Sequence, residues 1–158
     1  MLQGINLVEL TPEDKRFLEK FNQAKVLNLS FTGLKSLKNL PVIETLEKLD
    51  LSDNNLNGED LNQIYLAFKK IQVLLIANNS IKNPDYSAFL NKCSNMKKLD
   101  MSANPITEEK FYRENVFEKL GFLRGLDGYD KSDNEWSLQD SEEENKSDQS
   151  FEQFCKEI

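Results

Sequence analysis

Side chains that could act as nucleophiles, proton carriers or metal ligands are sparse in this chain. Its 158 residues contain no histidine, which removes the commonest zinc ligand and the usual proton shuttle. The two cysteines, Cys93 and Cys155, are far apart and in unlike contexts, so the sequence indicates neither a disulfide nor a thiolate metal site. We therefore expect no bound metal and no cofactor.

Two further patterns have the composition of a chemical site without its spacing. Gly125-Leu126-Asp127-Gly128 is rich in turn residues but lacks the spacing of a phosphate-binding loop. The adjacent carboxylates of Glu108 and Glu109 could in principle transfer protons, yet acids at the start of a helix are far more often there to favour the helix dipole. The sequence predicts no catalytic residue, and we expect that the protein is not an enzyme.

The composition is that of one ordinary domain. Hydrophobic residues make up 39% and charged residues 30% of the chain, which is typical of a soluble protein. The first residues show neither a basic start nor a long apolar run, so we expect no secretory signal and no membrane-spanning helix. These observations favour an intracellular protein, and we expect it to be a monomer.

Four segments share the template L-x-x-L-x-L-x-x-N-x-L with only conservative replacements. They are residues 24–34, 46–56, 71–81 and 96–106, so successive repeats begin 22, 25 and 25 residues apart. This spacing is typical of leucine-rich repeats, in which each repeat contributes one short parallel strand. The predicted fold is an α/β, right-handed leucine-rich-repeat solenoid. Its curved parallel sheet lines the concave face, between a helical N-terminal cap and a leucine-rich C-terminal cap.

Segments outside the strands carry helix and cap signals. Residues 11–14, Thr-Pro-Glu-Asp, combine an N-cap residue, a proline at the first helical position and early acids. Residues 109–120 have the pattern of a helix that leads into a last strand-like turn near Leu126. Apolar residues at helical spacing in residues 58–70 and 85–92 predict a partly helical convex side.

Alternation along each strand divides its residues between the core and the concave surface. In the second repeat Leu49 and Leu51 point inward, whereas Asp50 between them points outward. Applied to all four repeats, this register predicts a concave surface formed by Val26, Asn28, Ser30, Lys48, Asp50, Ser52, Val73, Leu75, Ala77, Lys98, Asp100 and Ser102. The asparagines at the fixed repeat position should turn inward and bond the backbone of adjoining loops; they are Asn54, Asn79 and Asn104.

The third repeat places Val73, Leu75 and Ala77 on this surface, between Asp50 and Asp100 of the neighbouring repeats. An apolar spot between acids suits a basic and partly apolar protein partner. Side chains on a tightly curved sheet can equally cover one another and leave a face that is merely solvated. The sequence does not choose between these two interpretations.

The excess negative charge is concentrated at the end of the chain. Residues 1–130 hold 17 Lys and Arg against 18 Asp and Glu, a net charge of −1, and residues 131–158 hold 3 against 9, a net charge of −6, which together give −7. Residues 131–149 contain only two large apolar side chains, so burial there cannot offset the entropy of ordering. We predict a repeat domain with both caps at 1–130 and a disordered or weakly ordered acidic tail at 131–158.

The acids of this tail suit a basic protein and repel nucleic acid. They are Asp133, Glu135, Asp140, Glu142, Glu143, Glu144 and Asp148. Solubility and spacing between domains explain the same charge equally well. Ser132, Ser137 and Ser141 each precede an acid by three residues, the pattern that acidophilic kinases accept, and are candidate phosphosites.

The end of the repeat region is similar to a known family. The segment Tyr112-Arg113-Glu114-Asn115-Val116-Phe117, followed by Leu120, Leu123 and Leu126-Asp127-Gly128-Tyr129-Asp130, resembles the C-terminal cap of the acidic leucine-rich nuclear phosphoprotein 32 family. The second repeat is also typical of that family, so the resemblance covers about residues 1–130 and extends to the acidic character of residues 131–158. Two features depart from the pattern: Gly121 stands where the cap usually has proline, and the tail is short.

The resemblance implies a non-catalytic adaptor of the nucleus that also shuttles to the cytoplasm. It implies binding of histones through the acidic tail, a part in chromatin and transcription control, and inhibition of a serine/threonine phosphatase. Similar caps occur in the leucine-rich A-prime protein of a spliceosomal ribonucleoprotein, whose solenoid is a structural clamp for an RNA-binding protein. In that alternative the concave face, not the tail, holds the partner. Both interpretations predict protein partners, with no membrane and no direct contact to nucleic acid.

Overall fold

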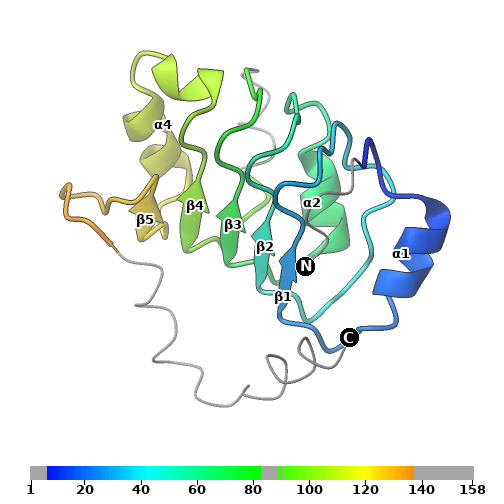
Figure 1. Cartoon of the computed structure of the whole chain (residues 1–158). Coiled ribbons are helices and arrows are strands. Elements are labelled where there is room, and N and C mark those ends of the chain that lie inside the picture. Colours follow the sequence, from blue (N-terminus) through cyan, green and yellow to red (C-terminus); the bar gives the residue numbers. More distant parts are fainter. Residues whose placement is uncertain (1–6, 83–88, 90, 137–158) are drawn as a thin grey trace.

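The computed structural model describes residues 7–82, 89 and 91–136. Five parallel strands lie side by side in chain order: β1 (Val26–Asn28), β2 (Lys48–Asp50), β3 (Val73–Leu75), β4 (Lys98–Asp100) and β5 (Gly125–Leu126) (Figure 1). The register aligns equivalent repeat positions, so that Leu49 lies opposite Leu27 on one side and Leu74 on the other. The predicted leucine-rich-repeat architecture with a parallel sheet is confirmed.

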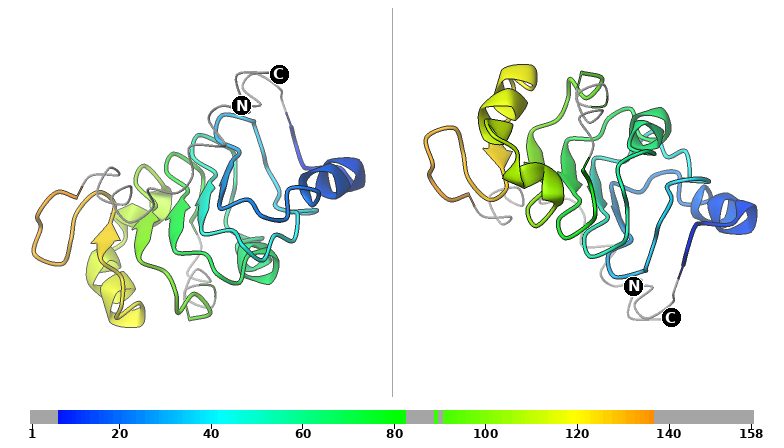
Figure 2. Two further views of the ribbon diagram at one scale, coloured as in Figure 1. Left: turned by 90° about the horizontal axis from the view of Figure 1, so that it is seen from below. Right: turned by 90° about the horizontal axis from the view of Figure 1, so that it is seen from above.

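Short helices lie at the two ends of the row of strands and on its convex side (Figure 2). At the first end, α1 (Pro12–Leu18) begins at the predicted signal, because the Asp14 N–H donates to Thr11 Oγ1 at 3.1 Å and the Thr11 N–H donates to the Asp14 carboxylate at 2.8 Å. On the convex side, α2 (Asn62–Ala67) lies within the predicted residues 58–70.

The C-terminal cap consists of a 3-10 turn, η1 (Pro105–Glu108), then α4 (Tyr112–Lys119), and then β5. The helix predicted for residues 109–120 begins later because Phe111, its N-cap residue, adopts a left-handed conformation with φ of 62°. Most of the predicted helical segment 85–92 lies outside the described residues. Within residues 7–82, 89 and 91–136, the structure contains no helix with the length and apolar character that crossing a membrane requires.

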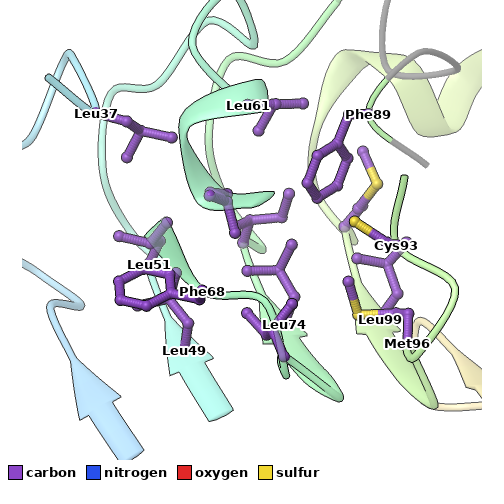
Figure 3. Close-up of a cluster of buried hydrophobic side chains, with 14 of the residues drawn as sticks. Leu37, Leu49, Leu51, Leu61, Phe68, Leu74, Phe89, Cys93, Met96 and Leu99 are labelled. Carbon is purple, nitrogen blue, oxygen red and sulfur yellow. The ribbon is translucent and has the colours of Figure 1, made fainter. Parts of the chain in front are cut away.

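The core fills the space between the sheet and the convex loops (Figure 3). The inward strand residues Leu49, Leu51 and Leu74 are fully buried, and Phe68 packs among them from the end of α2. Burial of each such side chain stabilises the fold by about 1.5–3 kcal/mol relative to exposure to water. The alternation of inward and outward residues therefore fixes which face of the sheet remains available to a partner.

A ladder of buried asparagines joins neighbouring repeats. Asn79 Nδ2 donates to the Leu51 carbonyl of the preceding repeat at 3.0 Å and to two carbonyls of its own turn. Its Oδ1 accepts the Leu56 N–H at 3.0 Å. Asn54 and Asn104 repeat this arrangement. The predicted inward orientation of these amides is confirmed, and each of them joins two consecutive turns of the solenoid.

The ladder predicts a large loss of stability in Asn79→Ala. This change leaves the buried Leu51 carbonyl and Leu56 N–H without their side-chain partner, and we expect the free energy of unfolding to fall by about 2–4 kcal/mol. The exposed neighbour Asn55 provides the control, since Asn55→Ala should change stability by less than about 0.5 kcal/mol. Urea unfolding followed by circular dichroism measures both, and equal losses in the two variants would contradict the role of the ladder.

Candidate protein-binding face

The concave face carries three rows of side chains that run across the strands. The first row is Val26, Lys48, Val73 and Lys98, and the second is Asn28, Asp50, Leu75 and Asp100. The third row follows the strand ends and consists of Ser30, Ser52, Ala77 and Ser102. The structure thus brings together the residues that alternation assigns to this face. The lysines of this face lie in the first row, where the strands begin, and the aspartates lie in the second row.

Two carboxylates are held at fixed places in the second row. Asp50 Oδ1 accepts the Ser52 N–H at 3.0 Å, and Asp100 Oδ1 accepts both the N–H and the hydroxyl of Ser102, at 3.0 and 2.7 Å. Both aspartates are half-buried and lie on either side of Leu75 in the sheet. Because adjacent strands are about 4.8 Å apart, the backbones of the two aspartates lie about 10 Å apart across Leu75.

The apolar spot between these acids is smaller than the sequence suggests. Leu75 is only 8% exposed, and Val73 and Ala77 are half-buried. Asp50 and Asp100 flank this leucine on the strands next to β3. Leu75 therefore offers a partner less apolar area than the strand register alone suggests. The most exposed large apolar side chain of the three rows is Val26, at 48%, and not Leu75.

Asp127, in the turn after β5, adds a carboxylate beside the second row. Its Oδ1 accepts the Met101 N–H at 2.7 Å. Burial raises the pKa of Asp127 and the nearby Asp100 carboxylate adds to the rise, whereas the bonds from the Met101 N–H and the Tyr112 side chain act in the opposite direction. The sequence alone identifies this residue only as part of a turn, because the four-residue composition does not show that the turn lies beside the sheet.

Trp136 covers the C-terminal end of the concave face. Its backbone N–H donates to the Gly128 carbonyl at 3.0 Å, and its indole lies so close to Gly125 that a Cβ on this glycine would overlap Nε1 of the indole. The Lys98 ammonium lies 4.4 Å from the centre of the indole ring. Residues beyond the predicted boundary at Asp130 therefore fold back onto the sheet, because the one tryptophan of the predicted tail packs flat against a glycine.

Three of the predicted tail residues lie in this returning segment. The exposed Asp133 carboxylate is 3.2 Å from Arg113, and Glu135 makes an isolated backbone bridge with Tyr129. The exposed Ser132 is held through its backbone N–H, which donates to the Asp130 carboxylate at 2.7 Å. The other predicted site residues of the tail, Ser137, Asp140, Ser141, Glu142, Glu143, Glu144 and Asp148, lie outside the described residues.

Three of the reactive side chains that the sequence analysis considers, Cys93, Glu108 and Glu109, lie in the part of the chain that the structure describes. The Cys93 thiol is buried, and burial raises its pKa to about 12, so it is not a thiolate near neutral pH. Residues 7–82, 89 and 91–136 contain no group of three or more Cys, Asp or Glu side chains placed to hold a metal ion. Glu108 is the last residue of η1 and Glu109 is its C-cap, so both acids belong to the helical turn that precedes α4.

Comparison with known proteins shows similarity in sequence. The Leucine Rich Repeat family model matches residues 45–65. Over 143 residues, 90% of this chain, the sequence is 34% identical to an acidic leucine-rich nuclear phosphoprotein 32-related protein of Plasmodium falciparum (isolate 3D7), of which 51% is covered. Over 117 residues, 74% of this chain, it is 34% identical to acidic leucine-rich nuclear phosphoprotein 32 family member A of Drosophila melanogaster, of which 44% is covered. The chain thus spans about half the length of these relatives.

Comparison with solved structures shows similarity in fold. The crystal structure of the Drosophila melanogaster SNF/U2A' complex contains a chain that superposes with a TM-score of 0.62. The alignment covers 96% of this chain and 100% of that chain, at 20% sequence identity. At this identity the comparison establishes the shared repeat architecture.

The contact between Trp136 and Gly125 predicts the effect of one added methyl group. Gly125→Ala places a Cβ where the indole lies, so we expect the indole to leave the sheet and its fluorescence to shift to longer wavelength as it enters water. Trp136 is the only tryptophan, so the emission reports on this contact alone. Gly121→Ala is the matched control, because no heavy atom lies within 4 Å of its added Cβ. Unchanged emission in Gly125→Ala would show that the contact does not form.

The raised pKa of Asp127 predicts a dependence of stability on pH. A carboxyl that binds its proton more tightly in the folded state stabilises the fold below its unfolded pKa, about 3.9, and this contribution is lost as pH rises through the higher folded value. Asp127→Asn removes the titration and keeps an oxygen to accept the Met101 N–H. We expect the stability of Asp127→Asn relative to the native chain to increase from pH 3.5 to pH 6, measured by urea unfolding. A difference independent of pH would rule out this effect.

Proposed function

The chain is a homologue of the acidic leucine-rich nuclear phosphoprotein 32 family over nine-tenths of its length, and on this premise we propose that it is a non-catalytic adaptor that binds basic proteins. The observation that carries the proposal is the second row of the concave face, where Asp50 and Asp100 are fixed on either side of Leu75. Histones are the class of basic partner that we propose.

The geometry of the row suits a lysine or arginine of the partner. The aliphatic part of such a side chain can lie over Leu75, while its cation lies near Asp50 or Asp100. Because each aspartate is held by its own serine, its carboxylate loses little freedom when a cation binds. Charge-assisted bonds of this kind fix orientation as well as adding affinity.

The tail contributes attraction over a longer range. Residues 131–158 carry a net charge of −6, whereas residues 1–130 carry −1. At physiological salt the Debye length is about 8 Å, so this charge speeds the encounter with a basic protein more than it fixes the bound geometry. We propose that the tail attracts the partner and the concave face orients it.

The proposal also includes a location in the nucleus and regulation by phosphorylation. The names of both relatives contain the words nuclear and phosphoprotein, which supports a location in the nucleus. Shuttling to the cytoplasm is part of the proposal. Phosphorylation of Ser132, Ser137 or Ser141 would add negative charge to the tail and strengthen its attraction for a basic partner. Through such partners the protein would modulate chromatin, transcription or a phosphatase.

Calorimetric titration with core histones tests the proposal. We expect Asp50→Asn/Asp100→Asn to weaken binding about three- to tenfold at physiological salt, because each ion pair at a protein surface contributes about 0.2–1 kcal/mol. The amides retain the oxygens that accept the serine N–H groups. The control is Glu114→Gln/Glu118→Gln, which removes two exposed charges from α4.

A tail variant separates the two surfaces in the same experiment. Neutralising Asp140, Glu142, Glu143 and Glu144 should weaken binding most at low salt and reduce its salt dependence. Absence of histone binding by the native chain would overturn the proposal. Loss of binding in the tail variant alone would remove the concave face from it. Loss in the concave variant alone, while the tail variant still binds, is the result that the clamp alternative predicts.

A further inference from the structure

A groove of about 490 Å³ lies beside the concave face, at the edge of the sheet where the strands begin. Its lining residues all precede strands β2 to β5 in the chain. They include Lys70, Asn95, Lys97, Phe122 and Arg124. Arg124 and Lys97 belong to neighbouring repeats, since the Arg124 N–H donates to the Lys97 carbonyl at 2.7 Å. The backbone ladder of the sheet therefore holds these side chains in one row.

The groove is basic although the chain is acidic. Its one carboxylate, Glu47, has an oxygen 2.6 Å from Lys25 Nζ and is already paired. Within residues 7–82, 89 and 91–136, Lys70, Lys97 and Arg124 form no ion pair. Three cations in a hollow raise the local concentration of anionic groups. The groove thus has the charge opposite to that of the tail.

The lining of the groove also contains exposed apolar and polar side chains. Phe122 in its lining is 80% exposed, the largest exposed fraction among the large apolar side chains that the structure describes. Exposed Ser94 and Asn95 add polar groups along the lining. An acidic peptide satisfies all three features, because carboxylates meet the cations, backbone groups meet the polar side chains, and an aliphatic residue covers Phe122.

The acidic segment of this chain is tethered next to the groove. Trp136, the last described residue, lies over Gly125, which directly follows Arg124 of the groove. The run Asp140-Ser141-Glu142-Glu143-Glu144 begins four residues after Trp136 and ends eight residues after it. Extended chain covers at most about 3.3–3.6 Å per residue, so these acids reach between about 13 and 29 Å from the anchor. A tether this short gives an effective concentration on the order of millimolar.

We propose that the groove is a binding site for an acidic peptide, and that residues 140–144 of the same chain occupy it. The groove residues lie outside the three rows of the concave face, whereas the acidic run is part of the tail that the proposed function uses to attract a partner. The contact does not require that function, since it involves this chain alone. It makes the tail a ligand of its own domain. A basic partner then competes with the groove for the tail, and a phosphate on Ser141 strengthens the internal contact as well.

Zero-length carbodiimide coupling on the dilute full chain tests the proposal, because it joins a lysine amine to a carboxylate only when the two touch. We expect amide links from Glu142, Glu143 or Glu144 to Lys70 and Lys97, found by mass spectrometry after proteolysis at 50 mM NaCl and reduced at 500 mM NaCl. The exposed Lys20, Lys38 and Lys110 lie outside the groove and are the internal reference. Links spread over all exposed lysines in proportion to exposure would overturn the proposal, as would links that join two chains.

A charge reversal at Arg124, which leaves Lys70 and Lys97 available for coupling, provides a second test. Arg124→Glu should lower the yield of links to Lys70 and Lys97 about two- to fivefold, whereas Lys119→Glu, an equal change on α4, should leave it unaltered. Amide NMR spectra of the full chain show whether both variants are folded. In the same spectra, Glu142→Gln/Glu143→Gln/Glu144→Gln should shift the signals of residues 94–97 and 122–124. Shifts absent from the groove would refute the contact even if histone binding were intact.

Discussion

The fold depends on how its buried turns satisfy their backbone groups. Strands β1 to β4 contain three residues each and β5 contains two, so the sheet ladder covers only a small part of each 22- to 25-residue repeat. Every turn then leaves carbonyl and N–H groups next to an apolar core, where an unpaired group costs about 1–3 kcal/mol. Asn54, Asn79 and Asn104 pair these groups from inside, each reaching back to the preceding repeat. Each inward amide therefore links two consecutive repeats through buried hydrogen bonds.

Because the amides hold the repeats in register, equivalent residues are stacked across the sheet, and the stacking has an electrostatic cost. Lysines or aspartates directly opposite each other on neighbouring strands would repel. Here Val73 and Leu75 of β3 stand between Lys48 and Lys98 and between Asp50 and Asp100. The apolar third repeat keeps like charges two strands apart. In the proposed function a partner's cation binds between these acids, so the same apolar residues would serve both stability and recognition.

Much of this could be predicted from the sequence, because the repeat ties local pattern to position. The strands, the direction of each strand residue, the inward asparagines and the start of α1 at Thr11 follow from spacing and residue type. The burial of Leu75, the place of Asp127 and the packing of Trp136 on Gly125 do not, because they depend on which segments meet in space. The predicted tail boundary rests on composition alone, and composition cannot show that one tryptophan has a glycine to pack against.

The two charged surfaces meet at that tryptophan. Lys98, which lies over the indole, belongs to the first row of the concave face. Its neighbour in the chain, Lys97, lines the groove. Trp136, the last described residue, therefore lies beside Lys98 and next to the groove, and Asp100 lies two residues along β4 from Lys98. An acidic tail anchored there is repelled by Asp50 and Asp100 and attracted by the groove. In the proposed arrangement the groove holds the acidic run away from Asp50 and Asp100, so that a basic partner can bind these aspartates and also compete with the groove for the tail.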